Sequence, residues 1–146
     1  MGDLYYLPNA RSQDQHDEMV RLEEGGLCLF CPEGLQGSDK IIYGSNSSWT
    51  LTSNDYPYVG TLHHLLLIPT RHVIALEELI ADELGTMKDL IWLAKNKFDF
   101  DSYGLAVRNG NPAFTGGTIR HLHFHIVVGN PNAEEPVKVK LSSRPK

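Results

Sequence analysis

The sequence predicts an α+β domain, an antiparallel sheet of about five short strands with one long helix and a shorter N-terminal helix. Apolar residues recur at every second position in several short segments bounded by turn residues, which is typical of strands. One segment, residues 76–94, repeats instead at helical spacing. Strands lie on both sides of this helix rather than alternating with helices, which favours an antiparallel sheet. The 146 residues are 41% hydrophobic and 21% charged, as in an ordinary globular domain.

The N-terminal part is polar, and we expect residues 1–26 to form a segment preceding a single domain over residues 27–146. Residues 14–24 can form a polar helix, which Gly25-Gly26 would end. We expect turn-like backbone at 33–39 and short strands at 40–43 and 49–53. A loop at 54–60 precedes an apolar strand at 64–68, closed by Pro69.

The apolar period then becomes helical from Leu76 to Ala94. Gly85 costs about 1 kcal/mol of helix propensity, so we allow a break near residues 80–82. A short strand is expected at 104–108, a loop with three glycines at 109–118, and a polar tail at 130–146.

Three histidines alternate with apolar residues at 121–128. As a strand, this segment would place His121, His123 and His125 on one side, about 6.6 Å apart at roughly 3.3 Å per residue. Imidazole titrates near neutrality, binds metals and can act as a nucleophile. A metal-only face and a solvated polar face are the alternatives. We favour a chemical site because the glycine-rich loop 109–118 leads directly into the stripe, and its backbone N–H groups could approach an anion.

Cys28 and Cys31 form a Cys-x-x-Cys pair. The pair could be two unliganded thiols, a redox pair or half of a zinc site. The Pro32-Glu33-Gly34 sequence that follows indicates a turn rather than the helix of a thioredoxin-type pair. Zinc needs two more ligands, and the spacing does not identify them. Taken singly, His64 and His72 would be core or surface histidines.

Charge and hydropathy argue against some classes of partner. A net charge of −5 disfavours a nucleic-acid partner. The N-terminus lacks a signal-peptide pattern, and no stretch reaches the ~18 apolar residues of a membrane span. We therefore expect a cytoplasmic protein with no nucleic-acid or membrane partner.

Together these segments resemble the histidine triad (HIT) family of nucleotide-binding hydrolases and transferases. Residues 121–128 match the family pattern His-φ-His-φ-His-φ-φ, where φ is apolar. His64, Pro69 and His72 fit its His-φ-φ-φ-φ-Pro-x-x-His strand, and residues 54–58 are similar to the branch that acts on dinucleoside polyphosphates. The resemblance runs from about residue 27 to residue 128. The chain departs from it at Gly117, where Gln is frequent, and at Gly129-Asn130, where many relatives have Pro-Arg.

The resemblance implies roles for individual residues. His123 would be the nucleophile, attacking the α-phosphorus of a nucleotide. His125, His64 and Thr118 would hold the phosphate oxygens. The implied nucleotide-binding residues are Asn54, Asn109, Gly116 and Gly117, and a structural zinc would be held by Cys28, Cys31, His72 and His121. Relatives are commonly homodimers, joined through the long helix and a sheet edge, and no redox cofactor is required.

The leading hypothesis is therefore a hydrolase or transferase that cleaves at the α-phosphate and releases a nucleoside monophosphate. Its substrate would be an adenine nucleotide in the form of a nucleoside phosphoramidate, an adenylylated amine or a dinucleoside polyphosphate, with water or phosphate as acceptor. The alternatives are a nucleotide-binding regulator with little catalysis and a zinc-handling protein that uses the whole histidine stripe.

Overall fold

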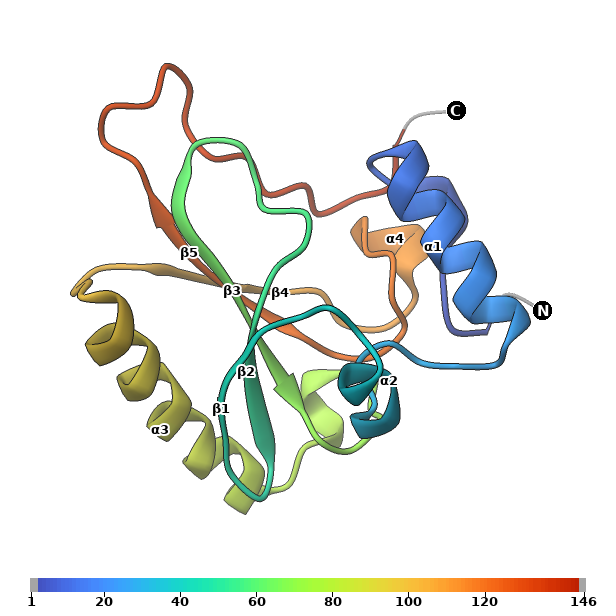
Figure 1. The fold of residues 1–146 in the computed structure, drawn as a ribbon, viewed down its shortest axis with the longest axis horizontal. Helices are drawn as coiled ribbons and strands as arrows, with labels where there is room; N and C mark the ends of the chain where they lie inside the picture. Colours follow the sequence, from blue (N-terminus) through green and yellow to red (C-terminus); the bar gives the residue numbers. More distant parts are fainter. Residues whose placement is uncertain (1–2, 145–146) are drawn as a thin grey trace.

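A computed structural model describes residues 3–144 and shows an open antiparallel sheet with helices on both faces (Figure 1). The five strands lie in the order β1-β2-β3-β5-β4, and each neighbouring pair is antiparallel. The predicted fold class is confirmed. The strands are β1 (Ile42–Ser45), β2 (Trp49–Ser53), β3 (Thr61–Pro69), β4 (Gly104–Val107) and β5 (Phe124–Gly129).

One face of the sheet is covered by the long helix α3 (Ala81–Phe98), which follows the 3-10 helix η2 (Leu76–Glu78). Leu90 and Ala94 of α3 pack with Trp49, Leu51 and other buried side chains of the sheet. The expected interruption is present, because η2 ends before α3 begins. A carboxylate oxygen of Glu83 accepts the Ile80 N–H at 2.9 Å and caps the start of α3.

The opposite face is covered by η1 (Leu7–Asn9), α1 (Gln13–Glu24) and α2 (Pro32–Gln36). The strand alternation in β3 sends Leu65 and Leu67 to the α3 side and Leu66 and Ile68 to this side. The N-terminal segment takes part in this second core, since Tyr5 and Met19 are 2% and 1% exposed in the same cluster as Leu66 and Ile68.

Two short helices stand where the sequence indicates turns and loop. Helix α2 replaces the turn-like stretch at 33–39. Gly34 is required in it, because a Cβ there would lie 2.0 Å from the Cys28 carbonyl oxygen. Helix α4 (Pro112–Thr115) lies inside the glycine-rich loop, capped by the Asn111 side chain at the Ala113 N–H. In both helices proline occupies the first turn, where a missing N–H costs nothing.

Strand β5 begins at Phe124, so His121 and His123 precede it rather than belonging to it. The ladder with β3 cannot extend further, since Pro69 has no N–H to donate. Residues 118–122 bond elsewhere: Arg120 N–H donates to the Leu4 carbonyl and Leu122 N–H to the Val73 carbonyl. The backbone nevertheless keeps the alternation, and Leu122 and Phe124 are buried on the α3 side.

None of the helices within residues 3–144 combines the length and apolarity needed to cross a bilayer.

Candidate functional site

His123 lines a cavity of about 70 Å³ on the sheet face covered by α1 and α2. Its Nδ1 lies 2.7 Å from the His121 carbonyl oxygen, which fixes the proton on Nδ1 and leaves a lone pair on Nε2. Burial lowers the pKa of His123 to about 4. The Phe30 ring packs edge-on against this imidazole at 4.8 Å between centroids. A neutral, oriented imidazole therefore faces the cavity.

His64 and His125 form a buried pair beside His123. The Tyr58 N–H donates to His64 Nδ1 at 2.9 Å, so His64 carries its proton on Nε2 and donates to His125 Nδ1 at 2.8 Å. His125 must then carry its own proton on Nε2. Burial lowers the pKa of His64 to about 4 and that of His125 well below its usual range. The network thus presents the Nε2–H of His125 as a donor.

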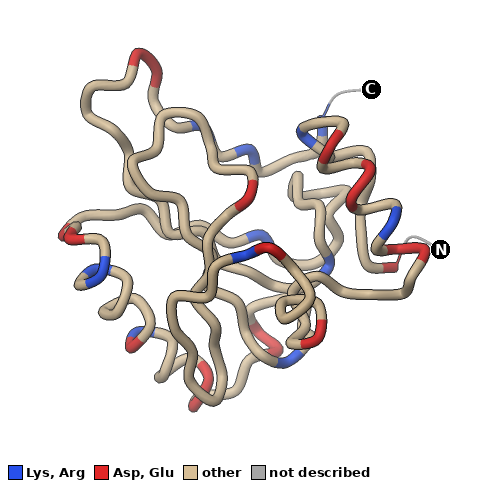
Figure 2. The backbone as a smooth tube through the Cα atoms, viewed as in Figure 1, with Lys and Arg blue, Asp and Glu red and all other residues tan. Residues whose placement is uncertain are grey.

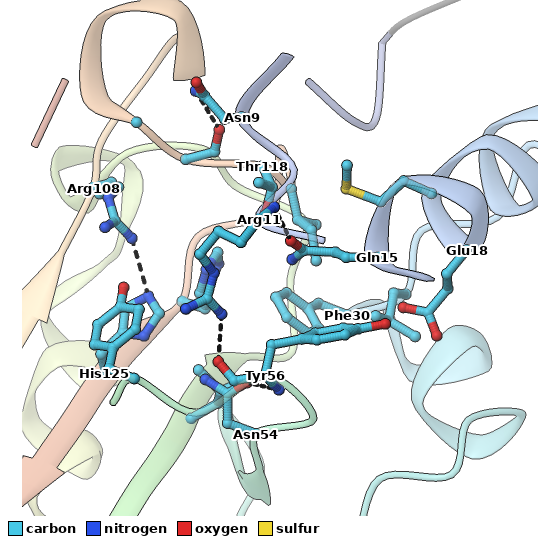
Figure 3. A pocket seen from close by; sticks show the side chains of 18 of the residues that line it. Asn9, Arg11, Gln15, Glu18, Phe30, Asn54, Tyr56, Arg108, Thr118 and His125 are labelled. Atoms are coloured by element: carbon cyan, nitrogen blue, oxygen red, sulfur yellow. Dashed lines mark hydrogen bonds between the residues drawn. The ribbon is translucent and has the colours of Figure 1, made fainter. Parts of the chain in front are cut away.

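Arg108 directs a second donor to the same place. Its Nη1 lies 3.4 Å from His125 Nε2, the contact drawn in Figure 3. Since that ring nitrogen already carries a proton, the two groups are both donors and cannot satisfy each other. An anionic oxygen between them would accept from both.

A further cation comes from the N-terminal segment. The guanidinium of Arg11 lies over the Tyr58 ring at 4.9 Å and bonds the Tyr56 carbonyl (Figure 3). Asn54 is held by the Tyr56 N–H, which donates to its Oδ1 at 2.8 Å, and its Nδ2 lies 3.1 Å from His64 Nε2. The same cavity is therefore lined by Arg11, Asn54, Tyr58 and Arg108 as well as by histidines.

The glycine-rich loop contributes three of the predicted residues to the wall of this cavity: Gly116, Gly117 and Thr118. Gly116 has φ +83°, and a Cβ there would lie 2.7 Å from the Ser142 carbonyl oxygen of the C-terminal tail (residues 130–144 as described). Glycine is thus required both for the backbone conformation and for close packing of the tail.

Asn109 is the one predicted nucleotide contact that the structure places elsewhere. Its Oδ1 accepts the Leu76 N–H at 2.7 Å, and it is not among the residues lining the cavity. The Asn109 side chain thus caps the start of η2, and the next residue adds a second contact, because the Gly110 N–H donates to the Ile74 carbonyl. These two bonds join the loop after β4 to the segment before η2.

Sequence reasoning missed Arg11 and Arg108. Arg108 directly follows β4, whose Val107 pairs with Phe124, the residue between His123 and His125. The pairing of β4 with β5 is the signal that could have identified Arg108. Arg11 lies in a polar segment without a motif, and only the packing of α1 on the sheet brings it to the site.

The predicted metal ligands meet in one cluster. Sγ of Cys28 and Cys31 and Nδ1 of His72 and His121 all lie within 4.8 Å of one another. Nδ1 of His121 is 3.5 Å from the Cys28 sulfur and 3.1 Å from His72 Nδ1, and the Cys31 sulfur is 3.3 Å from His72 Nδ1. Ligands at about 2.0–2.3 Å from a tetrahedral ion are roughly 3.3–3.8 Å apart. Two of the three distances fall in this range and the third is 3.1 Å, so the spacing is close to that of a zinc site.

His121 is also oriented as a metal ligand would be. Its Nε2 lies 2.8 Å from the Pro69 carbonyl oxygen, which places the proton there and turns the Nδ1 lone pair toward the cysteines. Burial, followed by the Cys28 charge, raises the pKa of Cys31 to about 12. A dication would favour both thiolates and relieve this repulsion. Of the three stripe histidines, His121 alone belongs to this cluster among the described residues.

The chain belongs to the HIT family: a family model described as HIT domain matches residues 38–132. A curated relative, an uncharacterized HIT-like protein of Methanocaldococcus jannaschii, is 27% identical over 77% of this chain and 86% of its own length. The family resemblance expected from the histidine motifs is confirmed.

Solved structures share the fold. A HIT family hydrolase from Clostridium thermocellum aligns with a TM-score of 0.61 at 22% identity, over 74% of this chain and 95% of its own. A zinc-bound histidine triad family protein from Mycobacterium smegmatis gives 0.55 at 22%, over 82% and 84%. Diadenosine triphosphate hydrolase of Plasmodium falciparum, solved with cyclomarin A, gives 0.53 at 19%, over 68% and 75%. The fold is therefore that of HIT-family hydrolases.

Proposed function

We propose that this protein cleaves nucleotide derivatives at the α-phosphate, with His123 as the nucleophile. The observation that carries the proposal is the orientation of His123, whose Nδ1 proton is bound to a backbone carbonyl while the Nε2 lone pair is free. Around the same cavity, Arg108 and the Nε2–H of His125 provide donors for phosphate oxygens.

The reaction would proceed in two displacements. Nε2 of His123 forms a bond to the α-phosphorus as the bond to the leaving group breaks and that group departs with the electron pair. Water then attacks the same phosphorus, the P–N bond breaks, and the nitrogen recovers its lone pair. The water proton passes to solvent or to the leaving group that has departed, and a nucleoside monophosphate is released.

Stabilisation of the transition state would come from preorganised donors. His64 locks His125 in the tautomer that presents Nε2–H, so His64 acts as a positioning residue and His125 touches the phosphate. Thr118, which also lines the cavity, would add its hydroxyl, whereas the Gly116 N–H already donates to the Pro112 carbonyl and the Gly117 N–H to the Thr115 hydroxyl. Removing one donor from such a site costs about 3 kcal/mol in the transition state.

Adenine nucleotides are the proposed substrates, in the form of a phosphoramidate, an adenylylated amine or a dinucleoside polyphosphate. The Plasmodium structure, named as a diadenosine triphosphate hydrolase, supports the last class through its shared fold. The proposed acceptor is water, with phosphate as the variant.

We propose that Cys28, Cys31, His72 and His121 hold a structural zinc ion. All four donors are protein atoms, so the ion would have no open position for substrate or water. Its chemistry would be to fix the backbone around His121, the residue whose carbonyl orients His123.

We also propose a homodimer formed through β4 and α3. Strand β4 is the last strand of the sheet order, and Leu105 on it is 42% exposed. Trp92 on α3 is 59% exposed. Light scattering coupled to size-exclusion chromatography would test this, and a monomeric mass at micromolar concentration would contradict it.

The catalytic proposal is tested by incubating the protein with adenosine phosphoramidate and with diadenosine triphosphate while AMP is measured. The wild type should release AMP and, after rapid quenching at alkaline pH, should carry an acid-labile adenylyl group. His123→Ala should do neither. Equal turnover by this variant would remove His123 from the mechanism, and no turnover of any adenylylated substrate by the wild type would favour a nucleotide-binding regulator.

A further inference from the structure

A second cavity of about 430 Å³ adjoins the histidine cavity. It lies between the β2–β3 loop and the C-terminal tail, and we call it the tail cavity. The two spaces are neighbours because several residues line both; these are Asn9, Arg11, Tyr58, Arg108 and Gly116. Its volume falls within the roughly 300–1,000 Å³ typical of ligand pockets.

The tail is fixed against the domain where it forms the cavity wall. Figure 1 shows it crossing from the end of β5 toward α1. Nε and Nη2 of Arg108 donate to the Lys140 carbonyl at 2.9 and 2.7 Å. The Ser143 hydroxyl donates to the Ala113 carbonyl at 2.6 Å and accepts from Asn9 Nδ2 at 3.2 Å. The wall is therefore held by specific hydrogen bonds from both ends of the chain.

The lining of the tail cavity is strongly basic. The lining residues include five cationic ones and one acidic one, Glu135; the cationic residues are Arg11, Arg108, Lys138, Lys140 and Arg144. Among residues 3–144 none of these five is in a salt bridge with a carboxylate. The whole chain carries a net charge of −5, so this concentration is local. Figure 2 shows blue segments along the tail beside this part of the fold.

The cations are close enough to repel one another. After burial, the charges of Arg108 and Arg144 lower the pKa of Arg11. Such a cluster is relieved by an anion, and guanidinium groups bind phosphate with paired hydrogen bonds. An uncharged amine would gain nothing from this lining.

We propose that the tail cavity is a leaving-group site that selects substrates whose leaving group carries phosphate, with Arg144 and Lys138 as specificity-determining residues. The inference depends on the proposed cleavage at the α-phosphate. With that phosphate between His123 and Arg108, the rest of the substrate would continue past Arg108 into the tail cavity, because Arg108 lines both. Both specificity residues lie beyond residues 38–132, the part that matches the family model.

The kinetic test compares two substrates that share the adenylyl group. For diadenosine triphosphate the leaving group bears phosphate, and for adenosine phosphoramidate it is ammonia. The kcat/KM for diadenosine triphosphate divided by that for adenosine phosphoramidate should fall about tenfold in Arg144→Gln, as expected for loss of one charge-assisted contact. The ratio should fall further in the double variant Arg144→Gln, Lys138→Gln. Lys88→Gln, an exposed lysine on α3, is the matched control and should keep the wild-type ratio. An unchanged ratio in the double variant would overturn the proposal.

A binding test separates this inference from the proposed function. Inorganic tripolyphosphate is titrated calorimetrically into wild type, Arg144→Gln and Lys88→Gln. The dissociation constant should rise about tenfold in Arg144→Gln alone. If no substrate were cleaved but this binding pattern held, the proposed function would fall and the anion site would stand. If tripolyphosphate did not bind, or bound equally to all three, the anion site itself would be refuted.

Discussion

His121 and His123 are two residues apart in one stripe, yet they present opposite nitrogens. Nε2 of His121 is bound to the Pro69 carbonyl, which leaves Nδ1 for the cysteines. Nδ1 of His123 is bound to the His121 carbonyl, which leaves Nε2 for the cavity. A single backbone carbonyl in each case decides which nitrogen carries the proton.

The comparison shows how one motif can serve both a closed metal cluster and an open reaction cavity. The two regions also touch, because Phe30 lies between the two cysteines in sequence and packs against the His123 ring. We therefore expect the cluster to contribute to stability and the cavity to chemistry, and the following changes test how sharply these contributions separate.

The largest expected effect is on chemistry. His123→Ala should reduce AMP release by about 10⁴-fold or more, the scale seen when a covalent nucleophile is removed. The zinc content, measured by elemental analysis, should stay at one per chain, because the cluster does not include the His123 ring. Loss of zinc in this variant would show that the two regions are not separable.

Removing a cysteine should affect zinc content and stability before chemistry. Cys28→Ser should abolish zinc binding and destabilise the fold by several kcal/mol, lowering the Tm by roughly 10 °C for a chain of this size. Calorimetric scans of the wild type with a strong chelator should resemble those of the variant, and the variant should not respond to the chelator. A chelator-resistant wild type free of zinc would contradict the structural ion.

The sequence predicted the sheet and the long helix because their apolar periods differ clearly and their ends carry turn residues. It did not predict α2 and α4, since each is too short to show a period and depends on proline at its first turn. The start of β5 was misplaced by three residues because alternation continues through His121 while the hydrogen bonds do not. Periodicity reports side-chain direction, and pairing depends on the partner strand.

For the site, the motifs identified histidines that lie in or beside β3 and β5 and the two cysteines that precede α2. The position of Arg11 depends on how α1 packs across the sheet, and the tail cavity depends on contacts between the two ends of the chain. Neither feature produces a pattern in the local sequence. The resemblance placed Asn109 at the nucleotide, whereas in the structure its side chain holds η2.

The pH dependence of stability distinguishes the cavity from the metal cluster through the His64–His125 pair. This pair faces Arg11, Arg108, His123 and the Tyr58 ring. The folded pKa of His64, about 4, is below its ordinary 6.5. Unfolding therefore takes up a proton between these values, and stability should fall as the pH falls from 6.5 toward 4. Each such proton contributes about 1.4 kcal/mol per pH unit.

Denaturant unfolding at several pH values would measure this slope. His64→Gln should reduce it by up to one proton, and His16→Gln, on the exposed surface of α1, serves as the control. Neither substitution touches the metal cluster, so the difference between the variants isolates the cavity. Equal slopes in the two variants would show that His64 is protonated as readily in the folded state as in the unfolded one.

The smallest expected effect concerns the corner that carries His72. The preceding residue, Arg71, donates to both carboxylate oxygens of Glu83 at 2.8 Å, and Glu83 also caps α3. Glu83→Gln should lower stability by about 1 kcal/mol through the lost ion pair with Arg71 and the weakened cap, and should leave AMP release close to wild type. Asp82→Asn, in the same first turn, is the matched control.

The pH dependence identifies the source of this small effect. The Arg71 hydrogen bond holds the pKa of Glu83 at about 2, below its ordinary 4.5. The ionised Glu83 carboxylate therefore stabilises the fold fully above about pH 4.5, and this stabilisation is lost as the pH falls toward 2. The free energies of unfolding of wild type and Glu83→Gln should converge there. If this variant instead reduced AMP release as strongly as it reduced stability, the corner at His72 would be acting on His123 through the metal cluster, and the separation of the two regions would fail.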